Sequence, residues 1–285
     1  MNTLEKAFEK SKTINKDNST EKNSSGTEEN SNLIDDDQSN VTEQQDIVKF
    51  NWDYLNEHGF IRKDESHSRL AEEYRNIKRP LVTNALGARK RDIKNANLIL
   101  ITSSVPGEGK TFTSINLAFS IAAELDKKVL LIDADVAKPS ISKVLGIKND
   151  VGLIDFLETD NLSLSDIILQ TEIPGLRIIT AGKSHKLSTE LLASDKMIAL
   201  SQELSERYSD RIVIFDTPPL LATTQAEVLA SQMGQIILVV GAESTPQNFV
   251  MESVQKLQNC SDVVLGLLNK AQQNHATGYY GYGNY

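Results

Sequence analysis

The chain has few of the features that secreted or membrane-spanning proteins need. Cys260 is the single cysteine among 285 residues, so no internal disulfide can form, and this usage is typical of a reducing compartment. No apolar run approaches the roughly 18 residues of a membrane span, and the N-terminus has no apolar signal core. We therefore expect a cytoplasmic protein whose length suffices for one α/β core plus extensions.

Basic surface is scarce as well. The formal net charge is −9, and residues 1–46 alone contain eleven acidic and five basic side chains. Because the remainder is almost balanced and no basic face dominates, we expect no nucleic-acid partner. Residues 17–45 have almost no large apolar side chains, which predicts a disordered linker. Residues 2–12 can form a short amphipathic helix through Leu4, Ala7 and Phe8, either as part of a solubilising tail or as a tethered docking helix.

What the chain does contain is a βαβ pattern between residues 97 and 138. Residues 98–102 and 129–132 are apolar runs of strand length, and apolar side chains between them recur at helical spacing from Thr111 onward. The polar turn after the first strand matches GxxxxGK[ST], except that Ser104 replaces the first glycine. The pattern predicts a phosphate-binding loop; the alternative is a glycine turn with a chance lysine.

The loop residues fit phosphate chemistry. Gly107 and Gly109 let backbone amides turn inward around phosphate oxygens, and the following helix presents its positive N-terminal end. Lys110 can reach the outer phosphates, and the Thr111 hydroxyl can bind magnesium. We therefore predict ATP and Mg²⁺ as cofactors.

Three aspartates follow predicted strands. Asp133 and Asp135 lie at the end of the strand over 129–132, and Asp216 closes the strand over 211–215. The carboxyl ends of parallel strands form the crevice in which open α/β sheets bind ligands. One carboxylate there can accept a hydroxyl proton while others support magnesium; helix capping is the alternative for Asp135.

The remaining pattern predicts further elements around this unit. We expect an extended arm or edge segment near residue 48 and a helix over 68–88. Beyond residue 150 we expect helices over 151–157 and 164–168, a helix from Thr189 and one over 247–257, together with strands over 176–180, 235–241 and 263–269. Asn269 and Lys270, at the end of the last strand, are candidates for contacting the nucleotide base. His185 is expected to be a surface loop residue rather than a metal ligand.

The last residues are rich in tyrosine. Tyr279, Tyr280, Tyr282 and Tyr285 are separated by glycine and asparagine without a core periodicity, which predicts a mobile exposed tail. Such tyrosines are better suited to be substrates than scaffold. The alternative is a low-complexity tail that packs on a partner.

These motifs together resemble those of bacterial tyrosine kinases, relatives of the MinD and ParA ATPases. PGEGKT at 106–111, LLIDAD at 130–135 and IVIFDTPP at 212–219 look like the Walker A, A′ and B motifs. DADVAKPS, ELLAS, DTPPLLATTQAEVLA and the N-terminal LEKAFEK are most similar to tyrosine autokinases of exopolysaccharide loci associated with exosortase systems. The resemblance covers nearly the whole chain apart from the acidic linker.

The resemblance implies a P-loop NTPase fold, a mostly parallel sheet flanked by helices, and a division into residues 1–46 (helix and linker), 47–96 (arm and oligomerisation helix), 97–272 (kinase domain) and 273–285 (tail). It implies that Lys110, Asp133 and Asp135 are catalytic and that Thr111, Asp133 and Asp216 hold the metal. The implied ATP-binding residues are Pro106, Gly107, Glu108, Gly109, Lys110, Thr111, Phe112 and Asn269.

The resemblance also implies partners. Glu72, Arg75 and Lys78 fall where the family has an ExxRxxR subunit-contact motif, so a ring or dimer is expected in which one subunit phosphorylates the tail tyrosines of the next. A separate membrane-bound polysaccharide chain-length regulator is expected to activate the kinase and to hold it at the inner membrane.

Two departures from the motifs bear on function. Ala137 stands where the A′ motif usually has arginine, and Val105 and Pro106 occupy the region of the MinD and ParA signature lysine. The second departure disfavours a MinD-like ATPase switch without protein phosphorylation, which remains the alternative function. A non-enzymatic interaction protein with a degenerate nucleotide site is a third possibility.

Overall fold

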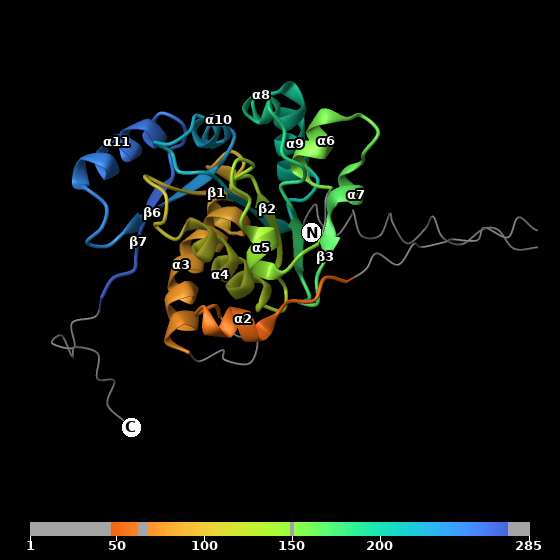
Figure 1. The fold of residues 1–285 in the computed structure, drawn as a ribbon. Coiled ribbons are helices and arrows are strands. Elements are labelled where there is room, and N and C mark those ends of the chain that lie inside the picture. The colour runs from red at the N-terminus through yellow and green to blue at the C-terminus, as the bar shows by residue number, and fades with distance from the viewer. Residues whose placement is uncertain (1–46, 62–67, 149–150, 273–285) are drawn as a thin grey trace, which may run out of the picture. The chain divides into compact units, whose positions relative to one another are not determined.

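The computed structural model describes residues 47–61, 68–148 and 151–272, and this part of the chain is built around a seven-stranded sheet (Figure 1). The strand order is β3-β4-β2-β5-β1-β6-β7. All neighbouring strands are parallel except β3 and β4, which are antiparallel. The strands are β1 (Leu98–Ser103), β2 (Lys128–Asp133), β3 (Leu169–Gln170), β4 (Leu176–Ile179), β5 (Arg211–Asp216), β6 (Gln235–Gly241) and β7 (Val264–Asn269).

Helices cover both faces of the sheet. One face is covered by α2 (Trp52–Glu57), α3 (Arg69–Leu86), α4 (Lys110–Ala122) and α5 (Ile141–Leu145). The other is covered by α6 (Leu153–Glu158), α7 (Leu164–Ile167), α8 (Ser188–Leu192), α9 (Asp195–Glu206), α10 (Gln225–Ala230) and α11 (Gln247–Gln258). A short 3₁₀ helix, η1 (Ala88–Arg91), follows α3.

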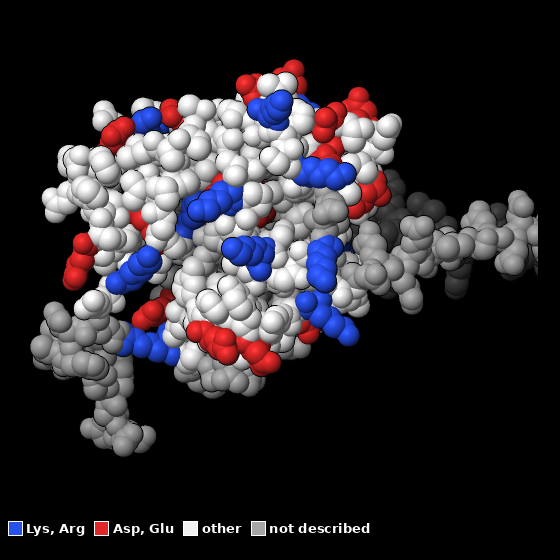
Figure 2. All heavy atoms as spheres, in the orientation of Figure 1, with Lys and Arg blue, Asp and Glu red and all other residues white. Residues whose placement is uncertain are grey.

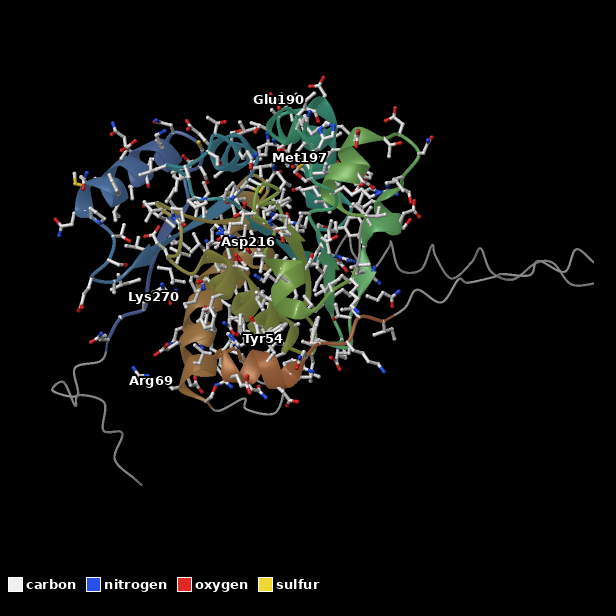
Figure 3. The ribbon with its side chains drawn as sticks, in the orientation of Figure 1. Tyr54, Arg69, Glu190, Met197, Asp216 and Lys270 are labelled. Atoms are coloured by element: carbon white, nitrogen blue, oxygen red, sulfur yellow. The ribbon has the colours of Figure 1, made fainter. Side chains whose placement is uncertain are left out.

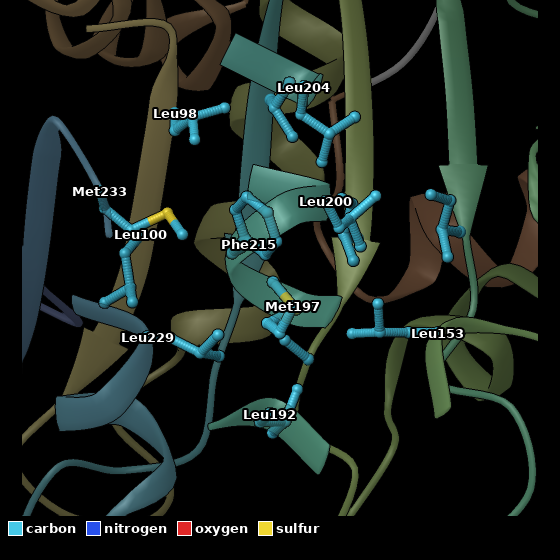
Figure 4. Packing of buried hydrophobic residues seen from close by; sticks show 14 of the residues in the cluster. Leu98, Leu100, Leu153, Leu192, Met197, Leu200, Leu204, Phe215, Leu229 and Met233 are labelled. Carbon is cyan, nitrogen blue, oxygen red and sulfur yellow. The ribbon is translucent and has the colours of Figure 1, made fainter. Parts of the chain in front are cut away.

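The alternation of side chains along the central strands divides the core into two layers. In β1, Leu98 and Leu100 pack in the layer beneath α9 and α10, shown in Figure 4, whereas Ile99 and Ile101 pack in the layer beneath α3 and α4. All six residues of β1 are buried. Strands buried on both faces read in sequence as continuous apolar runs, which is why β1, β2, β5 and β6 were predictable.

The predicted P-loop fold is therefore confirmed, with two local differences in these segments. Residues 52–57 form α2 rather than an extended arm, because the Asn51 side chain caps the helix by accepting a hydrogen bond from the Tyr54 amide at 3.1 Å. Val48 does pair in extended form, with Thr171 next to β3, as the expected edge segment. The helix predicted from Thr189 is divided into α8 and α9, since Ser194 caps the second.

The segment before the P-loop unit packs against it closely. The rings of Phe50 and Trp52 lie with their centroids 5.8 and 5.7 Å from that of Phe119 on α4. Leu55 and Phe60 are buried in the same layer. Aromatic side chains bury a large apolar area each, so this segment is fixed on the outer side of the helix that follows the phosphate loop.

Several predictions concern residues outside the described ranges. The helix over 2–12, the linker over 17–45 and the four tail tyrosines all lie there. Within the described ranges, none of the helices has both the length and the apolar character that a bilayer crossing demands.

Candidate nucleotide and active site

The predicted phosphate loop connects β1 to α4 at the carboxyl end of the sheet. Gly107 and Gly109 adopt φ angles of 87° and 98°, a left-handed conformation that disfavours residues with a Cβ. A Cβ on Gly109 would also collide with the side-chain amide of Asn269. Gly109 caps α4, so the loop amides and the N-terminal end of that helix point to one place, as anion binding requires.

Lys110 lies across the loop from the end of β2. Its Nζ is 2.7 Å from Oδ2 of Asp135, and the two side chains are 13% and 4% exposed. The ammonium group thus has a carboxylate partner inside the protein, with which triphosphate oxygens would compete. The Lys138 amide donates to the other oxygen of Asp135 at 3.1 Å, while the Lys138 side chain and Ala137 are exposed.

Asp216 is held by two hydroxyls of α4. Thr111 Oγ1 donates to one of its carboxylate oxygens at 2.7 Å and Ser114 Oγ to the other at 2.9 Å. Ser114 is a site residue that the sequence prediction missed. Its position one helical turn after Thr111, on the same face of α4, was the available signal.

Asp133 and Asp216 are direct neighbours in the register of β2 and β5. Asp133 accepts hydrogen bonds from the Ser140 and Ile141 amides at 3.1 and 3.0 Å, yet burial and the nearby Asp216 raise its pKa well above the usual range. Burial also raises the pKa of Asp216, against the opposing effects of Lys110 and the Thr111 and Ser114 hydroxyls. A positive ion beside these carboxylates would offset their mutual repulsion.

The donor set fits magnesium bound together with a nucleotide. Among the described residues no group of three or more His, Cys, Asp or Glu side chains forms a metal cage. Mg²⁺ is usually held by one or two carboxylates plus substrate phosphates and water rather than by such a cage. The Thr111 hydroxyl with Asp216 and Asp133 supplies hard oxygen ligands of that kind next to the loop.

The Glu108 side chain braces the loop. It is buried and accepts hydrogen bonds from the Val105 amide at 2.7 Å, from the Gly241 amide at 3.0 Å and from the Thr245 hydroxyl. These bonds tie the phosphate loop to the segment after β6. They leave the backbone amide of Glu108 for its predicted contact with ATP.

The end of β7 contacts the same loop. Asn269 Nδ2 donates to the Glu108 carbonyl at 2.8 Å, and Lys270 Nζ donates to the Gly107 carbonyl at 2.6 Å. Figure 3 labels Lys270 at this end of the strand and Asp216 nearer the centre of the sheet. Pro106 is exposed on the loop, whereas the Phe112 ring packs against Phe60, with 4.9 Å between centroids.

The predicted subunit-contact residues lie along α3 and differ in their surroundings. Glu72 and Arg75 form an ion pair, with side chains 54% and 38% exposed. Lys78 is buried; its Nζ donates to the Ser120 carbonyl at 2.5 Å and pairs with Glu124 at 2.8 Å. Lys78 therefore joins α3 to the C-terminal end of α4 within one chain.

Residues 96–272 match the family model described as an AAA domain. The tyrosine-protein kinase YwqD of Bacillus subtilis is 33% identical over 225 residues, which cover 78% of this chain and 90% of YwqD. The putative tyrosine-protein kinase EpsB of Ralstonia nicotianae is 34% identical over 188 residues, which cover 66% of this chain but 24% of EpsB.

Solved structures resemble the fold as well. The kinase domain of the Escherichia coli tyrosine kinase ETK has a TM-score of 0.65 and 27% identity, covering 84% of this chain and 95% of that domain. The septum site-determining protein MinD of Pyrococcus horikoshii, complexed with Mg-ADP, has a TM-score of 0.53 and 25% identity, covering 62% of this chain and 72% of MinD. The phosphate loop, the paired aspartates and these likenesses together show that the chain belongs to the family of bacterial tyrosine-protein kinases.

Proposed function

We propose that the chain is an ATP-dependent protein-tyrosine autokinase. The observation that carries the proposal is the gathering of Lys110, Thr111 and three strand-end aspartates beside the phosphate loop. Lys110 pairs with Asp135, Thr111 donates to Asp216, and Asp216 is the register neighbour of Asp133. Lys110 would leave Asp135 to neutralise the outer phosphates. Thr111, Asp133 and Asp216 would hold Mg²⁺, which when bound neutralises charge on the transferred phosphoryl group.

The carboxylates at the end of β2 would receive the proton of the tyrosine hydroxyl. A base works best when its pKa is close to the working pH. Burial and the neighbouring Asp216 raise the pKa of Asp133 in the free protein, before Mg²⁺ binds, and Asp135 lies two residues further, beside Lys110. Asp133 and Asp135 together are therefore the proposed base, and their own chain positions them through the Ser140, Ile141 and Lys138 amides.

The proposed acceptors are Tyr279, Tyr280, Tyr282 and Tyr285 of a neighbouring subunit in a ring or dimer. Glu72 and Arg75 have the exposure that a subunit contact needs. Lys78, which is engaged with α4, would position α3 rather than touch the neighbour. The proposed biological role is control of exopolysaccharide synthesis and export, under activation by a membrane-bound chain-length regulator that keeps the kinase at the inner membrane.

Phosphotyrosine formation tests the proposal directly. The purified full chain should become labelled on tyrosine with Mg²⁺ and ATP, and Lys110→Ala should abolish the label. Phenylalanine at all four tail positions should remove most label while transfer to an added tyrosine substrate persists. ATP consumption with no phosphotyrosine in any of these samples would contradict the kinase proposal.

The likeness to MinD favours a second candidate function, an ATPase switch that dimerises on ATP and transfers no phosphate to protein. That function predicts phosphate release at an equal rate with and without the four tail tyrosines. Phosphate release coupled to tail labelling would exclude it.

A further inference from the structure

A groove lies between α11 and the strands β6 and β7. It has a volume of about 940 Å³, and its apolar lining includes Val240, Val250, Val254, Met251 and Leu268. Met251 and Leu268 are 72% and 64% exposed. Figure 2 shows that charged side chains are sparse over α11 on the face in view. An exposed apolar groove is typical of a surface that binds another protein segment, a membrane or a ligand.

The walls of this groove are bonded to the phosphate loop. From α11, Ser253 Oγ donates to Ser104 Oγ at 2.9 Å. At the end of β6 and in the loop that follows it, the Gly241 amide and the Thr245 hydroxyl donate to the Glu108 side chain. From β7, the residue after Leu268 is Asn269, which donates to the Glu108 carbonyl. Whatever fills the groove therefore contacts the same elements that hold the loop.

We propose that the unphosphorylated C-terminal segment, residues 273–285 of the same chain, docks in this groove and leaves it when its tyrosines are phosphorylated. Release of the segment on phosphorylation rests on the proposed kinase function. Docking itself depends on the groove and the composition of the segment.

The position of the segment favours this occupant over a separate partner. The described chain ends at Gln272, three residues after β7, which forms one wall of the groove. Thirteen further residues span up to about 40 Å when extended. The twelve residues of α11 extend over about 18 Å. The segment is therefore long enough to reach every part of the groove on the chain to which it belongs.

The chemistry of the segment also fits. Residues 273–285 contain four tyrosines and no acidic or basic side chain apart from His275. Tyrosine buries an apolar ring and needs a hydrogen-bond partner for its hydroxyl. The groove offers apolar side chains along its floor and the amide groups of Gln247, Asn248, Gln255 and Gln258 around it.

Phosphorylation would reverse this fit. Each phosphate adds a charge of about −1.5 to −2 at pH 7, and near acidic side chains such a group is expelled by repulsion and desolvation. Glu243 and Glu252 are the acidic side chains that line the groove. Docking would thus slow the first phosphorylation, which takes place in chains whose segment has left the groove, and after it the remaining tyrosines stay accessible.

Photo-crosslinking tests the docking. Benzoylphenylalanine replaces Tyr282 in the full-length Lys110→Ala chain, which keeps the tail unphosphorylated. Irradiation should attach it to α11 or β7, with Met251 the expected site because benzophenone inserts readily into methionine, and the product should run at the mass of one chain. Wild-type chain treated with a tyrosine phosphatase provides a second route to the same measurement. Attachment only in a two-chain product, only outside the groove, or nowhere would overturn the proposal.

Two comparisons sharpen this test. Met251→Glu with Leu268→Glu should reduce the crosslink at least tenfold, since both side chains are exposed and can change without disturbing the core. An undiminished crosslink would overturn the proposal.

A synthetic 273–285 peptide should compete with the tethered segment at least tenfold better than its phosphotyrosine form, and equal competition would overturn the release step. If the crosslink forms but the wild-type chain makes no phosphotyrosine, the kinase function is rejected and the docking stands.

Discussion

The two sides of the phosphate loop are built from different interactions. Toward β2 and β5 the contacts are ionic and buried, with Lys110, Asp133, Asp135 and Asp216 within one cluster. Toward β6, β7 and α11 the loop is held by single hydrogen bonds, in which amide and hydroxyl groups donate to the Glu108 side chain, the Glu108 carbonyl and Ser104. Most of the surface beyond is apolar and exposed. The ionic side holds charges that the fold alone does not balance. The hydrogen-bonded side sets the position of the loop.

The two kinds of contact should have different effects on activity. Buried carboxylates with raised pKa values destabilise the folded state at neutral pH, a cost typical of sites that bind cations or move protons. Single hydrogen bonds contribute about 1 kcal/mol each, and those to a carboxylate about 1.5–3 kcal/mol. We therefore expect changes on the ionic side to affect catalysis strongly and changes on the hydrogen-bonded side to affect nucleotide affinity modestly.

The largest effect is expected from Lys110→Met, which keeps the apolar stem and removes the charge. Phosphotyrosine formation should fall by about 10³-fold, by analogy with the loss of a group that stabilises charge in the transition state. The matched control is Lys128→Met at the opposite end of β2, whose partner Asp210 is on the surface; exposed pairs of this kind are worth at most about 1 kcal/mol. Similar rates for the two variants would contradict the assignment of Lys110.

Asp216→Asn should separate catalysis from stability. Activity should fall by about 10²-fold because the metal-binding charge is lost, whereas the free protein should gain stability on the order of 1 kcal/mol at pH 8. The raised pKa means that the carboxylate form is disfavoured in the folded state. Thermal unfolding at pH 8 measures the gain, which should shrink toward pH 5. A destabilised variant at pH 8 would show that Asp216 is satisfied by Thr111 and Ser114 alone.

The pH dependence of the unmodified protein gives a third measure of the ionic side. Asp133 and Asp216 have folded-state pKa values above their unfolded values near 4. The folded state therefore binds more protons than the unfolded state, and the contribution of these two groups to the free energy of unfolding falls as the pH rises from about 5 to 8. Asp210, whose pKa is lowered to about 2 beside Lys128 and Arg211, has the opposite effect on the free energy of unfolding, and only below about pH 4.

Binding of Mg²⁺ and ATP at pH 7 should release protons from Asp133 and Asp216, seen by calorimetry in buffers of different ionisation enthalpy. Identical heats in all buffers would place the metal elsewhere.

The smallest effect is expected on the hydrogen-bonded side, from Glu108→Gln. The amide offers one acceptor where the carboxylate receives three hydrogen bonds, so a buried donor loses its partner at a cost of about 1–3 kcal/mol. Nucleotide affinity should weaken by about 5- to 50-fold, with less change in the rate at saturating ATP. Glu243→Gln, an exposed neighbour in the segment after β6, is the control and should bind nucleotide normally. A larger effect on the rate than on affinity would give Glu108 a role in the reaction itself.

Much of this arrangement could be predicted from residues that are close in sequence. The loop, its helix and the strands β1, β2, β5 and β6 were identified because buried parallel strands and glycine turns have local signatures. Asn51 and Ser194 were missed as helix caps, which turned an expected arm into α2 and divided the helix after Thr189. The short helices α5 and α10 and the two-residue strand β3 lack a periodic signal long enough to recognise.

The sequence by itself determined the expected chemistry: a lysine and a threonine after two glycines, and aspartates where apolar runs end, predict phosphate and metal binding through backbone conformation and local charge. Only the tertiary structure decided which of these groups meet, because parallel pairing places Asp133 beside Asp216 although 83 positions separate them. It also decided that Glu108 braces the loop and that Lys78 is buried against α4. Both outcomes depend on the packing of distant segments, and the energy of that packing has no signature in the residues next to either side chain.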